Sequence, residues 1–96
     1  MTNSYLDKEV SKDMDLESRI AVVGVVVEDR VNAAQKVNEI LSLHADMIVG
    51  RLGVPHKEKD AGVIALIING TTDEIGSLTG KLGNVKGVKV KSAITA

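Results

Sequence analysis

The sequence predicts an α+β fold in which two helices cover one face of a four-stranded antiparallel sheet. Segments of strand length alternate with segments whose apolar residues recur at helical spacing, in the order βαββαβ. Two of the four strand-like segments are apolar throughout, which is typical of central strands. The other two carry charges at alternate positions, which is typical of edge strands.

The first strand and the first helix are predicted from residue 20 onward. Residues 20–27, IAVVGVVV, are mostly β-branched, and Asp29 is a candidate N-cap for the helix that follows. The apolar residues of this helix recur at helical spacing and are expected to face the sheet, namely Val31, Ala34, Val37, Ile40 and Leu41. The pattern ends at residues 43–47, LHADM.

The second and third strands are predicted on either side of a charged hairpin loop. In residues 47–54, MIVGRLGV, one side of the strand carries Ile48, Gly50, Leu52 and Val54, and the other carries Val49, Arg51 and Gly53. Pro55 ends this strand. Residues 62–68, GVIALII, are apolar on both sides and predict a buried strand.

The second helix and the last strand complete the pattern. Thr71 and Glu74 have the spacing of a capping box, so a helix should begin there. Its inward residues are expected to be Ile75, Leu78 and Leu82. In residues 88–94, VKVKSAI, lysines alternate with apolar residues, which predicts a strand with one solvated side.

This order of elements predicts a ferredoxin-like sandwich, with the first and third strands central and the second and fourth at the edges. Two helices can cover only one face of such a sheet, yet the central strands are apolar on both faces. A large uncovered apolar face usually marks an interface. We therefore expect a homo-oligomer, a dimer or a tetramer, packed sheet to sheet.

The composition limits the chemistry that the chain can perform. It has 96 residues, enough for one small domain, and no cysteine, so disulfides, thiol nucleophiles and thiolate metal sites are excluded. No secretory signal and no membrane-spanning run is present, which predicts a cytoplasmic protein without membrane contact. Residues 1–18 are acidic and unpatterned and predict a flexible tail, with the domain in residues 19–96.

Three segments of the chain resemble one family of small ferredoxin-like proteins, the iron-only hydrogenase system regulators. They are RIAVVGVVVEDR, VNEILSLHADMIVGRLGVP and TTDEIGSLTGKLGNVKGVKVK, and the resemblance extends over nearly all of residues 19–92. That family is similar to ACT domains and to the C-terminal domain of nickel-responsive regulators. The resemblance implies a ligand-sensing or assembly module that works as a dimer or tetramer.

A nickel site would need histidines that this chain lacks. Nickel-responsive regulators place two histidines at alternate positions of the strand after the first helix, whereas IVGRLGVP at residues 48–55 has none. Only His44 lies in the corresponding neighbourhood. We therefore expect no cofactor and no metal, with His44 as a weak candidate ligand.

Enzymatic and nucleic-acid functions find no support in the sequence. No Ser-His-Asp arrangement, HExxH motif or carboxylate pair can be identified, which predicts a protein that is not an enzyme. The aromatic content is 1%, so bases could not stack on the sheet, and direct nucleic-acid binding is not expected.

Two classes of function remain: a non-catalytic ligand-sensing regulator, and a structural adaptor that assembles with a hydrogenase-system protein without a small ligand. A sensor needs polar groups at a subunit boundary, and the candidates are Glu28, Asp29, Arg30, Arg51 and His56. Gly76 and Gly80 are candidates for close approach by a second subunit or a ligand, or for close packing within the chain.

Arg51 has the most specific prediction. We expect it to point to the uncovered sheet face and to pair there across the oligomer, or at a ligand site, with Glu28 or Asp29 as possible partners. His56 is expected at the rim. The alternative for the loop after Pro55 is a solvated hairpin connection.

Overall fold

A computed structural model describes residues 18–56, 58 and 60–96 of the chain. The predicted tail lies outside this part except for Ser18, whose Oγ donates to Asn69 Oδ1 at 2.7 Å. The elements follow the predicted order: β1 (Arg19–Val27), α1 (Arg30–Leu43), a 3-10 turn η3 (Ala45–Met47), β2 (Ile48–His56), β3 (Ala61–Gly70), α2 (Thr72–Gly83) and β4 (Val88–Ile94).

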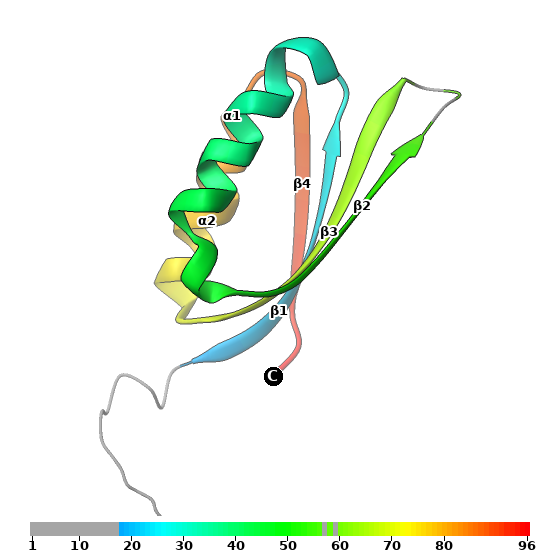
Figure 1. Ribbon diagram of the computed structural model, residues 1–96. Helices are drawn as coiled ribbons and strands as arrows, with labels where there is room; N and C mark the ends of the chain where they lie inside the picture. The colour runs from blue at the N-terminus through cyan, green and yellow to red at the C-terminus, as the bar shows by residue number, and fades with distance from the viewer. Residues whose placement is uncertain (1–17, 57, 59) are drawn as a thin grey trace, which may run out of the picture.

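The four strands form one antiparallel sheet in the order β2-β3-β1-β4. The apolar strands β1 and β3 are central, and the charge-bearing strands β2 and β4 are at the edges, which confirms the predicted fold class. Both helices lie on the same face of the sheet (Figure 1). The helices α1 and α2 follow β1 and β3, which are antiparallel, so the two helices also run antiparallel to each other.

The core lies between the helices and the sheet. Alternate residues of the central strands are buried there, and their largest members are Val23, Val25, Leu66 and Ile68. The buried residues of α2 are the three predicted ones, Ile75, Leu78 and Leu82.

The apolar side of α1 differs from the predicted one at its first turn. The buried residues are Ala33, Val37 and Leu41, with Ile40 packed at the margin, whereas Val31 is 91% exposed. Val31 is wrong as a core residue because it lies two residues before the buried Ala33, about 200° away around the helix and so on the opposite side. It remains an isolated apolar side chain on the surface.

Both helices begin with side-chain caps that the sequence predicts. Asp29 caps α1 by accepting from Asn32 N at 3.2 Å. Thr71 and Glu74 form the capping box of α2, with Thr71 N donating to Glu74 Oε1 at 2.8 Å and Glu74 N donating to Thr71 Oγ1 at 3.1 Å. These bonds satisfy backbone donors that a helix leaves without partners and fix where each helix starts.

The edge strand β2 contains an irregularity that changes which way its residues point. Ile48 pairs with Ile68, but Gly50 pairs with Ile67, so the register shifts by one residue between them. A β-bulge of this kind adds one residue to one strand and turns the side chains beyond it to the opposite face. Arg51 consequently pairs with Leu66, whose side chain is buried on the helix side.

Candidate functional site

The sheet face without helices, here called the open face, is apolar in the middle. Because alternate residues of a strand point to opposite faces, and Ala21, Val23 and Val25 are buried under the helices, their neighbours in β1 point to the open face. Its large apolar residues are each 45–65% exposed and come from three adjacent strands: Ile20, Val22, Leu52, Val54 and Ile67.

Two small residues, Gly24 of β1 and Ala65 of β3, lie side by side on this face between the larger Leu52 and Lys91. Gly24 pairs with Ala65 on one side and with Lys91 on the other, and Ala65 pairs with Leu52. No atom lies within 4 Å of the position that a Cβ would take on Gly24, so Gly24 and Ala65 are open to solvent. Larger side chains, Val22 and Val26, stand on either side of Gly24 along β1.

Arg51 does not point to the open face, so the predicted orientation is wrong. Its Nη2 donates to Asn38 Oδ1 of α1 at 2.9 Å, on the helix side of the sheet. The bulge in β2 places Leu52 and Val54 on the open face and Arg51 beside the helix layer. At an edge strand, a long side chain can extend past the helices and keep its charged end in water, so this arginine needs no buried carboxylate.

The three charged residues of the β1–α1 turn are each engaged within the chain. Glu28 Oε2 lies 3.3 Å from Lys89 Nζ. Arg30 Nη1 lies 3.7 Å from Asp60 Oδ1. The carboxylate of Asp29 accepts from both the side-chain amide and the backbone N–H of Asn32, and these bonds, in that order of importance, hold its pKa below the ordinary value, with a smaller contribution from Lys86.

His56 is the last residue of β2, where it pairs with Ala61 across the hairpin, and it is exposed. Its place at the rim of a subunit interface stays a prediction. No hydrogen bond joins it to Arg51 or to the β1–α1 turn in the described part of the chain, so the structure does not bring the predicted charged residues into one pocket.

His44 caps the end of α1 and lies beside α2. Its Nε2 is 3.3 Å from Lys81 Nζ. Partial burial lowers the pKa of His44, the Lys81 ammonium lowers it further, and Glu74 opposes the shift. Within residues 18–56, 58 and 60–96, no three His, Asp or Glu side chains are grouped as metal ligands, and the side-chain contact of His44 is with the ammonium group of Lys81.

Gly76 and Gly80 lie on the outer side of α2, and neither packs closely against the rest of the chain. A Cβ added to either would meet no atom within 4 Å. Together with β4 they line a shallow groove of about 780 Å³. The structure therefore gives no support to close packing within the chain as their role.

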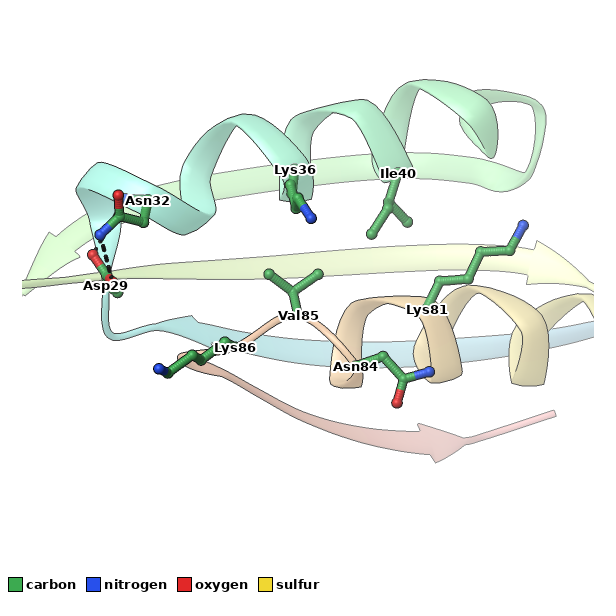
Figure 2. A pocket seen from close by; sticks show the side chains of 8 residues that line it. All are labelled: Asp29, Asn32, Lys36, Ile40, Lys81, Asn84, Val85 and Lys86. Atoms are coloured by element: carbon green, nitrogen blue, oxygen red, sulfur yellow. Dashed lines mark hydrogen bonds between the residues drawn. The ribbon is translucent and has the colours of Figure 1, made fainter.

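A second groove, which sequence reasoning did not identify, runs between α1 and α2 (Figure 2). Its volume is about 740 Å³, within the range of small-molecule sites. Three lysines contributed by α1, α2 and the loop after α2 line it: Lys36, Lys81 and Lys86. In the sequence these lysines are 45 and 5 residues apart, so only the packing of the two helices brings them to one groove.

In the described part of the chain, neither helix is long and apolar enough to cross a membrane. No curated protein matches the sequence. Among solved structures, an uncharacterized protein, TM1266 from Thermotoga maritima, is similar at 39% identity and a TM-score of 0.80, over 83% of this chain and 100% of that one.

Two more distant structures share the fold alone. The C-terminal domain of the MgtC protein from Mycobacterium tuberculosis matches at 15% identity and a TM-score of 0.65, over 90% of this chain and 94% of that one. The regulatory subunit of aspartate kinase from Thermus flavus matches at 16% identity and a TM-score of 0.50, over 81% of this chain and 57% of that one.

One protein family matches most of the domain. The TM1266-like family, described as "Iron-only hydrogenase system regulator, putative", matches residues 19–92, from the first residue of β1 into β4. This span includes every element of the fold and confirms the resemblance seen in the sequence. The chain belongs to the TM1266-like family of iron-only hydrogenase system regulators.

Proposed function

We propose that this protein is a non-catalytic regulator of the iron-only hydrogenase system that works as a homo-oligomer and responds to a small molecule. The observation that carries the proposal is the family match over residues 19–92. Two observations support a non-catalytic role. The chain has no cysteine, and the charged residues after β1 form ion pairs or a helix cap within the chain.

The open face supports the oligomeric part. Five large aliphatic side chains remain about half exposed on it, and full burial of each such side chain contributes about 1.5–3 kcal/mol. If a second copy covered the remaining half, each protomer would gain about 4–7 kcal/mol before the entropic cost of association. The lysines of β4 lie at the edge of this face, where their ammonium groups can stay in water.

A structural adaptor is the alternative, and the same open face favours it, since a partner protein could cover the apolar side chains instead of a second copy. The two functions differ in their need for a small ligand. A sensor must gain stability from a ligand, whereas an adaptor needs only its protein partner.

The test combines sedimentation equilibrium with thermal unfolding of the full chain in the presence of amino acids, nucleotides and metal ions. A ligand that binds only the folded state raises the melting temperature in proportion to the logarithm of its concentration. We expect a concentration-independent dimer or tetramer and at least one class of ligand that stabilises it. A monomer that no compound stabilises would contradict the proposal, and a stable complex with a hydrogenase-system protein that no compound alters would favour the adaptor.

A further inference from the structure

The groove between α1 and α2 has an apolar floor and a cationic rim. Ile40 and Val85 form the floor and pack on the hydrophobic core below them. Figure 2 shows Lys36 beside Ile40 on α1, facing Val85, with Lys81 toward one end of the groove and Lys86 toward the other end, near Asp29. A molecule lying on the floor would therefore have ammonium groups on three sides.

Within the part of the chain that the structure describes, the positive charge of the rim is offset only in part. The ion pairs of the described residues, Glu28 with Lys89 and Arg30 with Asp60, leave the three groove lysines out. The groove contains one carboxylate, Asp29, which stays negatively charged while it caps α1 and interacts with Lys86, so three lysines against one carboxylate leave the groove with a net positive charge. The contact of Lys81 is with an imidazole whose pKa is lowered, so this contact supplies no negative charge.

This concentration of charge contrasts with the whole chain, whose formal net charge is −1. Like charges around one groove repel one another, and an anion placed between them would remove that repulsion. The ammonium group of lysine is a point charge that can bind a phosphate from any direction. Arginine, whose planar guanidinium forms two parallel hydrogen bonds with a carboxylate, does not line this groove.

We propose that the groove between α1 and α2 binds a phosphorylated organic molecule of the nucleoside diphosphate class. The phosphates lie beside the ammonium group of Lys36, between Lys81 and Lys86 at the two ends of the groove, and the organic part lies on Ile40 and Val85. The side-chain amides of Asn32 and Asn84, which also line the groove, are placed to hydrogen-bond with sugar hydroxyls. The inference rests on the proposed sensing function and names the class of ligand.

Isothermal titration calorimetry of the full chain with ADP tests the inference, with inorganic pyrophosphate and citrate as comparison anions at matched ionic strength. We expect ADP to bind more tightly than pyrophosphate, because only ADP has a part that covers the floor. Citrate should bind more weakly than either. Added salt should weaken all binding, because the groove is open to solvent.

Three exposed lysines can be changed without disturbing the core, and a fourth provides a matched control. Lys36→Gln, Lys81→Gln and Lys86→Gln should each weaken ADP binding by about fivefold, corresponding to about 1 kcal/mol for an exposed charge contact. Lys91→Gln removes the same charge from the open face of β4, far from the groove, and should leave binding unchanged. Circular dichroism and the melting temperature without ligand verify that each variant is folded.

Three results would overturn the inference: no binding of ADP at millimolar concentration, an equal loss of binding in Lys91→Gln, or citrate binding as tightly as ADP. The proposed function would survive each of these results if another class of compound stabilised the oligomer. It would fail separately if the chain were a monomer that no compound stabilises.

Discussion

Replacing Ile67 by lysine should separate the proposed oligomer into folded monomers. Ile67 lies in the middle of the open face, where it pairs with Val22 of β1 and Gly50 of β2, and it is 48% exposed. Half of the 1.5–3 kcal/mol available from burying an isoleucine therefore remains to be gained, about 0.7–1.5 kcal/mol in each protomer and twice that in a symmetric dimer. A buried ammonium group adds a desolvation penalty of several kcal/mol.

The sum of these effects exceeds about 4 kcal/mol, which corresponds to at least a thousandfold weaker association. Sedimentation equilibrium measures the loss, and circular dichroism verifies that the monomer is folded, as we expect because the new side chain points into solvent. Val31→Lys is the matched control, since Val31 is apolar and 91% exposed but lies on α1, away from the open face. An Ile67→Lys protein that remains oligomeric, or a Val31→Lys protein that dissociates equally, would refute sheet-to-sheet packing.

Three further predictions concern stability. Thr71→Ala removes the capping box of α2 and should lower the free energy of unfolding by about 1 kcal/mol in urea titrations. Gly87→Ala should lower the free energy of unfolding by at least about 1–2 kcal/mol, because Gly87 has φ +83° and a Cβ there would lie 3.0 Å from the Cβ of Asp29. Gly76→Ala should raise it by up to about 1 kcal/mol, because Gly76 lies in a helix and a Cβ there would meet no other atom. The pKa of His44 is lower in the folded chain than its ordinary value of 6.5, so the unfolded chain binds a proton at a higher pH than the folded chain does. The free energy of unfolding should therefore fall as the pH is lowered from about 7 to 5. This dependence on pH should be weaker in His44→Gln than in His56→Gln.

The fold could be predicted from the sequence because local signals and the sheet pattern agree. The capping box at Thr71 and the N-cap at Asp29 mark helix starts without reference to any distant residue. The apolar character of β1 and β3 on both sides distinguishes central from edge strands. Each of these signals depends on neighbouring residues or on composition, which a sequence displays directly.

The candidate site could not be predicted in the same way. The orientation of Arg51 depends on a bulge between Ile48 and Gly50. An alternating pattern shows that neighbouring residues point to opposite faces, but it does not show which of the two sets points to the helices. In this sheet both faces are apolar, so hydrophobicity could not decide between them. The lysine-lined groove depends on how two helices pack, and each of its lysines alone is typical of a solvated surface.

The pair of small residues Gly24 and Ala65 on the open face has a consequence for self-recognition. Val22 and Val26 stand on either side of Gly24 along β1, so a surface that covers the open face closely must place a projecting side chain opposite this pair. In the proposed oligomer, Val22 and Ile67 of a second copy would supply the projecting side chains. In related chains, a bulky side chain at position 24 would fill the space above Gly24 and prevent a second copy from packing there. The smallest residue on this face would thus limit which subunits can assemble together, even though it contributes almost no contact area of its own.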